Sequence, residues 1–181
     1  MEHDLEKTMA LLERTPGALD ALLRGLPEGW THGNEGEGTW NVAEVVAHLI
    51  HCERVDWLPR VKIVVKDGEG RAFDALDREG NLKESEGKAL GALLDEFAGL
   101  RAANLEELRG MRLGAREMEL RGRHPAQGVV VLRELLAAWA AHDLTHLHQI
   151  SRVMAHQYRE AVGKWGEYLG VMRCGGHSAA G

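Results

Sequence analysis

Two histidines four residues apart lie on the apolar face of a predicted helix, in the run His142-Asp-Leu-Thr-His146. That face follows steps of three or four residues: Leu132, Leu135, Trp139, His142, His146, Ile150 and Val153. Burying a polar group without a partner costs about 1 to 3 kcal/mol, so each imidazole needs a hydrogen bond or a bound ion. The spacing indicates either hydrogen-bonded core histidines or two ligands of a divalent metal ion.

A metal ion bound by two imidazoles needs at least one further ligand from another element. A second predicted helix, residues 41–65, offers His48, His51, Cys52 and Glu53 within a few turns. We select His48, because it lies within an apolar run, whereas His51 and Glu53 are nearer the polar end of this helix. Three neutral imidazoles leave one or more coordination positions open for water or substrate, as expected of a catalytic ion.

Other residues near these ligands have weaker predictions. Asp143 could orient an imidazole as a hydrogen-bond acceptor or could face solvent. Cys52 is interpreted as a small buried apolar residue rather than a ligand. Trp40, Trp57 and Trp139 are large enough to wall a pocket, although core packing is the favoured role. The histidines without ligand spacing are interpreted as solvent-facing or structural: His3, His32, His124, His148, His156 and His177.

Apolar residues follow the period of an α helix along most of the chain and almost never alternate, so the predicted fold class is all-α. Four long helices are predicted, with approximate ends, over residues 5–26, 41–65, 84–109 and 129–158. The Thr15–Pro16 pair should restart and bend the first helix, and Pro59 should bend or end the second. These helices and their loops predict a four-helix bundle with metal ligands on facing helices.

The connections are predicted from glycine and polar residues. Residues 27–39 should form a loop, 67–86 a long connection with a short helical turn, and 110–127 a loop with a short extended piece at 116–121. Asn41 and Glu44 have the spacing of a capping box at the start of the second helix. A short C-terminal helical segment should pack onto the bundle through Trp165, Tyr168, Leu169 and Val171.

The length of 181 residues is enough for one domain, which we assign to residues 1–173, with a flexible tail at 174–181. A net charge of −6 without a basic stripe argues against a nucleic-acid partner. The two cysteines suggest no disulfide framework, and no signal peptide or membrane-spanning segment is evident. We therefore expect a cytoplasmic protein with no membrane partner, and a homodimer through exposed helix faces is compatible with this size.

The two histidine-bearing segments resemble DinB-like proteins. The segment from Gly38 to Arg60 resembles their second helix, the segment His142–Ile150 resembles their last core helix, and the residues Gln157–Trp165 are similar to tails in one branch of the superfamily. The resemblance implies a four-helix bundle with a long crossover connection and a divalent ion bound by three histidines. Carried over to this sequence, the ligands are His48, His142 and His146, the same three residues selected above.

The resemblance leaves the chemistry open, because a fold does not determine a function. Relatives include S-transferases and isomerases that use low-molecular-weight thiols, metal-dependent hydrolases and proteins of unknown activity. The first hypothesis is therefore an enzyme whose ion activates a small thiol or a water, acting on a small-molecule substrate. A hydrolase would need a general base, for which Glu44 and Glu53 are candidates. The alternative is a stress-related, non-enzymatic protein with a structural metal. Three imidazoles suit several metals, with zinc or nickel favoured.

Overall fold

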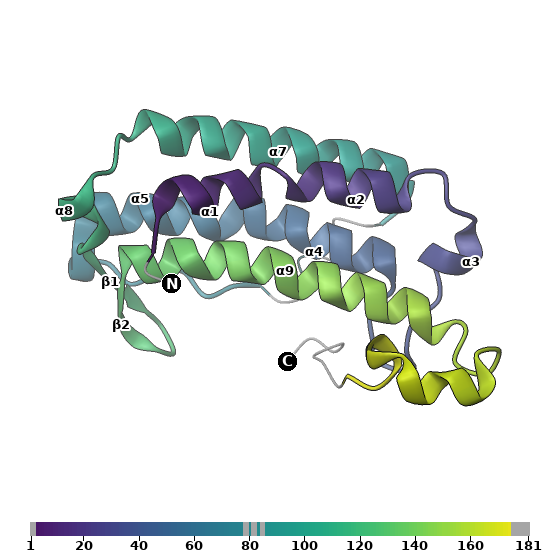
Figure 1. The fold of residues 1–181 in the computed structure, drawn as a ribbon. Helices are drawn as coiled ribbons and strands as arrows, with labels where there is room; N and C mark the ends of the chain where they lie inside the picture. Colours follow the sequence, from purple (N-terminus) through teal and green to yellow (C-terminus); the bar gives the residue numbers. More distant parts are fainter. Residues whose placement is uncertain (1–2, 78–79, 81–82, 84–85, 175–181) are drawn as a thin grey trace.

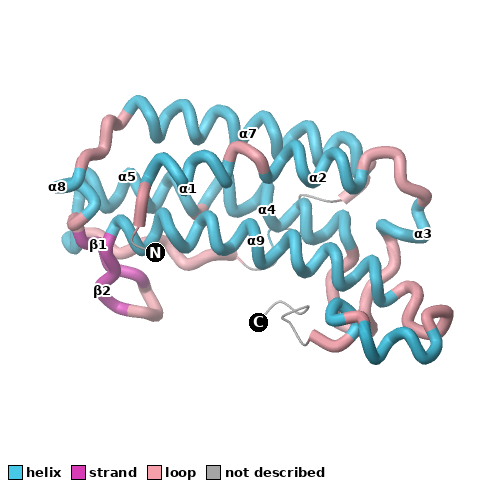
Figure 2. Tube along the Cα trace, viewed as in Figure 1, coloured by secondary structure: helices cyan, strands magenta, loops and turns pink. Residues whose placement is uncertain are grey.

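The computed structural model describes residues 3–77, 80, 83 and 86–174. Its long helices form a four-helix bundle, which confirms the predicted all-α fold class (Figures 1 and 2). Two of the four arms are each built from two consecutive helices. In chain order the arms are α1 (Leu5–Leu12) with α2 (Thr15–Leu23), α4 (Val42–Val55) with α5 (Trp57–Asp67), α7 (Leu90–Gly110), and α9 (Leu132–His156).

The interruptions in the first two arms follow from local sequence. Helix α2 begins at Thr15 with Pro16 in its first turn, where a missing backbone N–H has no effect on helical bonding. The break between α4 and α5 falls at Asp56, three residues before Pro59. A proline ring clashes with the carbonyl four residues earlier, here that of Val55, so the helix cannot continue through this point. Both predicted bends are confirmed.

A short antiparallel hairpin precedes α9 and was not predicted. Strand β1 (Arg121–His124) pairs with β2 (Gly128–Val131), so α9 begins at Leu132 rather than near 129. The prediction of an extended piece at 116–121 was wrong, because Ala115–Met118 forms the short helix α8. The β-branched residues 129–131 favour a strand. The turn is closed by His124, whose Nδ1 accepts the backbone N–H groups of residues 126 and 127 at 3.1 Å each.

Other boundaries also differ from the sequence predictions. The loop predicted at 27–39 contains the helical turn α3 (Glu28–Thr31), and α7 begins at Leu90 rather than near residue 84. The connection between α5 and α7 begins with the 3-10 turn η1 (Gly68–Gly70) and is long, as predicted. Among the described residues, no helix combines the length and apolar character needed to cross a bilayer.

The C-terminal segment packs on the bundle through only part of its length. It consists of two 3-10 turns, η2 (Gly163–Tyr168) and η3 (Gly170–Met172), of which η3 lies against α9. Trp165 and Tyr168 are 73% and 80% exposed, so these two rings do not attach the segment to the bundle as predicted. Within the predicted flexible tail, only Cys174 lies in the described part of the chain.

The bundle core contains two apolar clusters along its length. One is centred on Leu58, Leu105 and Trp139, and the other on Val46, Phe97 and Ile150. At the level where these clusters meet, α4, α7 and α9 contribute buried polar side chains instead of apolar ones. These are His51, Glu53, Arg101, Asp143, His146 and Gln149. The candidate site belongs to this polar layer.

Candidate metal centre

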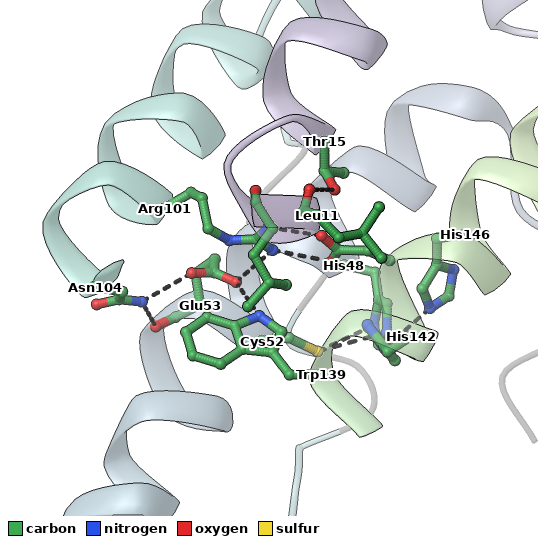
Figure 3. A network of polar contacts seen from close by, with 12 residues as sticks. Leu11, Thr15, His48, Cys52, Glu53, Arg101, Asn104, Trp139, His142 and His146 are labelled. Carbon is green, nitrogen blue, oxygen red and sulfur yellow. Dashed lines mark hydrogen bonds and ion pairs between the residues drawn. The ribbon is translucent and has the colours of Figure 1, made fainter. Parts of the chain in front are cut away.

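Three imidazoles from two antiparallel arms of the bundle converge in the polar layer. His48 comes from α4, and His142 and His146 come from consecutive turns of α9 (Figure 3). The Nε2 atom of His142 lies 3.1 Å from Nε2 of His48 and 3.0 Å from Nε2 of His146. One ligand atom of each histidine lies within 4.8 Å of the others. The structure thus brings together the three residues selected from the sequence.

Hydrogen bonds among the neutral rings cannot account for both contacts of His142. The Nδ1 of His146 lies 2.7 Å from Oε1 of Gln149, an oxygen that only accepts, so Nδ1 carries the proton and Nε2 carries a lone pair. His142 can donate its single Nε2 proton to His146, or it can present a lone pair to His48. At most one of the two contacts is therefore a hydrogen bond between neutral imidazoles. A cation shared by three lone pairs satisfies all of them.

The spacing of the rings also fits a divalent ion. Metal–nitrogen bonds of about 2.0 to 2.1 Å place neighbouring ligand nitrogens about 2.9 Å apart in octahedral geometry and about 3.4 Å apart in tetrahedral geometry. The two Nε2 separations of 3.0 and 3.1 Å lie within this range. His48 and His142 are only half-buried, so part of the cluster reaches solvent.

Burial keeps these imidazoles neutral. Loss of solvent, followed by repulsion from His146 and His51, lowers the pKa of His48 to about 3. The same cause, followed by repulsion from His146, His48 and Arg101, lowers the pKa of His142 to about 2. Burial also lowers the pKa of His146. Neutral imidazoles with available lone pairs are the form that binds metal ions.

Comparisons with known proteins agree with the resemblance seen in the sequence. A family model described as the DinB superfamily matches residues 11–150, most of the chain. The chain belongs to the DinB superfamily. A comparison with curated protein sequences gives no match.

The DinB fold is also seen in a solved structure. YfiT from Bacillus subtilis aligns with a TM-score of 0.68 and 21% sequence identity, over 84% of this chain and 88% of YfiT. YfiT is described as a probable metal-dependent hydrolase with an unusual four-helix bundle topology. At this identity the likeness shows a common fold.

Gln149 is a site residue that the sequence analysis missed. It is 2% exposed and lies one turn beyond His146 on α9, where its side-chain carbonyl accepts the Nδ1 proton of that histidine. Such a bond fixes the ring orientation and directs the Nε2 lone pair toward the cluster. A glutamine three residues after a predicted ligand on the same helix face was the available signal.

We expect Gln149→Leu to weaken binding of Zn²⁺ by about 10- to 100-fold, because outer hydrogen bonds to metal-bound histidines typically contribute that much. Competition against a chromophoric chelator would measure the affinity. Gln157→Leu is the control, since Gln157 lies near the end of α9 and bonds to backbone carbonyls. Equal affinities for the wild type and Gln149→Leu would show that this hydrogen bond does not orient a ligand.

The low pKa values of His48 and His142 predict an acid-sensitive metal-free protein. Between these values and the unfolded value of about 6.5, the unfolded chain binds more protons than the folded one, so stability falls as pH falls. We expect each histidine to cost about 1 to 2 kcal/mol between pH 7 and pH 5. Urea denaturation of chelator-treated protein at both pH values measures this loss. A His48→Gln/His142→Gln variant should lose less stability between pH 7 and pH 5 than the wild type. An equal loss would show that these two histidines do not cause the acid sensitivity.

The acidic candidates from the sequence have other partners. Glu44 forms the predicted capping box, with its Oε2 2.8 Å from the backbone nitrogen of Asn41. Glu53 was assigned to the polar end of its helix but is 2% exposed and binds Arg101, as does Asp143. Asp143 is therefore neither solvated nor an acceptor for an imidazole proton. None of these carboxylates is placed to act as the general base proposed from the sequence.

Two donors on α4 lie near His48 without joining the cluster. Cys52 is buried, as predicted, and its Sγ lies 3.5 Å from Nε2 of His48 (Figure 3). Burial raises its pKa well above the usual value, which favours the neutral thiol. His51 is buried against Gly80, and its Nε2 has no hydrogen-bond partner among the described residues, so its assignment to the polar end of the helix was wrong.

The predicted core role of the tryptophans is confirmed for Trp57 and Trp139. Trp139 is fully buried, and Trp57 stacks on it with ring centroids 6.1 Å apart. Trp57 also contacts His142, and Trp40 contacts His48, each with centroids 5.0 Å apart. These two rings therefore flank the cluster as well as packing.

The remaining histidines are outside the cluster. His124 closes the hairpin turn, and the Nε2 of exposed His148 lies 3.1 Å from Sγ of Cys174. His3 contacts Thr8, and His32 contacts Thr31. His156 lies in the last turn of α9, and His177 is outside the described residues.

Proposed function

We propose that this DinB protein is a metal-dependent hydrolase of a small molecule, with a divalent ion bound by His48, His142 and His146. The observation that supports this most is the convergence of three neutral imidazoles whose contacts cannot all be hydrogen bonds. Such an ion would supply Lewis-acid activation of a water or of a substrate carbonyl at neutral pH. The description of YfiT as a probable metal-dependent hydrolase supports the same reaction class.

The surroundings of the cluster can bind a small organic substrate. Trp57, which contacts His142, also lines a cavity of about 310 Å³ between α5, α9 and the hairpin. This volume lies within the usual range for small-molecule pockets. Leu135 and Val130 contribute apolar walls, and Arg60 and His124 contribute polar groups. The cavity would hold part of a substrate, and Trp57 is the residue that it shares with the surroundings of the histidine cluster.

The absence of a placed carboxylate base favours a second candidate, activation of a low-molecular-weight thiol. In the described part of the site, Glu44, Glu53 and Asp143 are all engaged elsewhere. A thiol with a pKa of about 8.5 needs less help to ionise than a water does. An S-transferase reaction is therefore the alternative outcome of the same assay.

The test is an activity screen of protein loaded separately with Zn²⁺, Ni²⁺, Co²⁺ and Mn²⁺. Carboxylic esters, amides and phosphoesters test hydrolysis, and a small thiol with an electrophilic acceptor tests transfer. We expect hydrolysis that is lost with a chelator and restored by one of these ions. Thiol transfer without hydrolysis would replace the proposed reaction with the second candidate.

A structural ion gives a different pattern, which thermal melting can detect. Chelation would then lower the melting temperature strongly, and no substrate in the screen would react in the loaded state. A catalytic ion with open positions predicts a smaller drop together with activity. Elemental analysis of the purified protein would identify zinc, nickel or another metal. A homodimer and a cytoplasmic location stay predictions, and light scattering after gel filtration would test the first.

A further inference from the structure

A buried ionic cluster lies beside the three histidines in the polar layer of the bundle. Arg101 of α7 donates from Nη1 to Oδ2 of Asp143 at 2.6 Å and from Nη2 to Oδ1 at 2.9 Å. The same Nη2 donates to Oε1 of Glu53 on α4 at 2.8 Å. One guanidinium therefore binds two carboxylates from two other helices. Figure 3 shows its contact with Glu53.

The hydrogen-bond partners show that both carboxylates are ionised. Besides Arg101, Glu53 accepts from Nε1 of Trp139 at 3.0 Å and from Nδ2 of Asn104 at 2.9 Å. Both oxygens of Asp143 accept from Arg101. Every side-chain partner of the two carboxylates is a donor, and donors stabilise the ionised form. Burial alone would lower the pKa of Arg101, but its bonds and attraction to the two carboxylates raise it, so the guanidinium is charged.

The cluster therefore carries a net charge of −1, from two carboxylates and one guanidinium. Glu53, Arg101 and Asp143 are 2%, 1% and 0% exposed, so neither water nor salt screens this charge effectively. One carboxylate would be enough to neutralise Arg101. The second leaves an excess negative charge in the core, which costs stability unless a cation lies nearby.

The excess charge lies close to the three histidines. Asp143 follows His142 directly in α9, and Glu53 follows Cys52, whose Sγ lies 3.5 Å from Nε2 of His48.

We propose that the Glu53–Arg101–Asp143 cluster acts as a buried counter-charge that raises the affinity of the three-histidine site for divalent cations. This inference depends on the proposed metal site. The attraction scales with the charge of the ion, so it is twice as large for a divalent as for a monovalent cation. This difference between the two kinds of ion separates an electrostatic role from a purely structural one. If the cluster only held the helices in place, its loss would reduce the affinity for both kinds of ion equally.

The test compares Zn²⁺ and Cu⁺ binding to two nearly isosteric variants. Asp143→Asn on α9 and Glu53→Gln on α4 each bring the cluster to zero net charge. Because the two residues lie on different helices, one variant is sufficient for the test if the other fails to fold. We expect each to weaken Zn²⁺ binding by about 10- to 100-fold. Because the interaction energy with Cu⁺ is half as large, the loss for Cu⁺ should be about 3- to 10-fold. Chelator competition, done anaerobically for Cu⁺, measures both affinities.

Two controls separate charge from structure. Trp139→Phe removes one donor to Glu53 without changing the charge of the cluster and should leave both affinities close to wild type. Glu44→Gln removes a carboxylate from the first turn of α4, outside the cluster, and should also have little effect. Equal losses for Zn²⁺ and Cu⁺ in the Asp143 and Glu53 variants would overturn the counter-charge role. Failure of the wild type to bind Zn²⁺ would instead refute the metal site and the proposed function.

Discussion

A His142→Ala variant is expected to lose stoichiometric binding of a divalent ion, with its affinity reduced by more than about 100-fold. The Nε2 of His142 contacts Nε2 of both His48 and His146, so it is the candidate ligand that links the two helices at the site. Outer residues already contribute about 10- to 100-fold to metal affinity, and loss of a ligand should exceed that range. Calorimetric titration with Zn²⁺ and elemental analysis after gel filtration would measure the loss.

His148→Ala is the matched control for this prediction. His148 lies on the same helix but is exposed, and its Nε2 contacts Cys174 instead of the cluster. We expect this variant to bind the ion and to hydrolyse substrate as the wild type does. A His142→Ala protein that retained one ion at full affinity would refute the three-histidine site. A wild type that bound the ion tightly without hydrolysing any substrate would refute only the proposed reaction.

Local spacing made the three candidate ligands predictable. His142 and His146 occupy positions of an apolar helix face, and His48 lies in a similar run on another helix. Burial on a helix face depends on periodicity, which is visible in the sequence. Their mutual approach depends on how α4 packs on α9, which the bundle predicted from the four helices and the resemblance to DinB-like proteins both indicated.

The ionic cluster behind the histidines was harder to predict, because each member pairs with a residue far away in the chain. Arg101 lies on the same face of α7 as Phe97 and Leu105, so a charged residue within an apolar seam was the available signal. Nothing local identifies Glu53 and Asp143 as its partners. Glu53 was therefore assigned to a polar helix end and Asp143 to a role beside an imidazole.

The hairpin at residues 121–131 was missed for a different reason. Its strands are four residues each, and Val129 is exposed, so no alternating pattern forms. The strand instead depends on register with β1 and on the turn closed by His124. Such short pairings are determined by tertiary contacts that periodicity does not encode.

An Arg101→Met variant is expected to have the largest loss of stability, about 3 to 5 kcal/mol, because it leaves two buried carboxylates without their counter-ion. The substitution also removes the donor to the backbone carbonyl of Leu12, which links α7 to the end of α1. Urea denaturation at neutral pH measures the loss. Arg24→Met is the control and should stay close to wild type, since Arg24 pairs with Asp20 and Asp95 at the surface.

The pH dependence of the Arg101→Met deficit tests whether charge or packing causes it. Without the guanidinium two unpaired charges are buried, and an unpaired buried charge costs more stability than the neutral carboxyl group that forms at lower pH. The deficit relative to wild type should therefore shrink as pH falls from about 7.5 toward 5. A deficit that stayed constant over this range would indicate lost packing around Phe97 and Trp139, which the guanidinium also contacts. It would also remove the basis for treating the cluster as a site of excess negative charge.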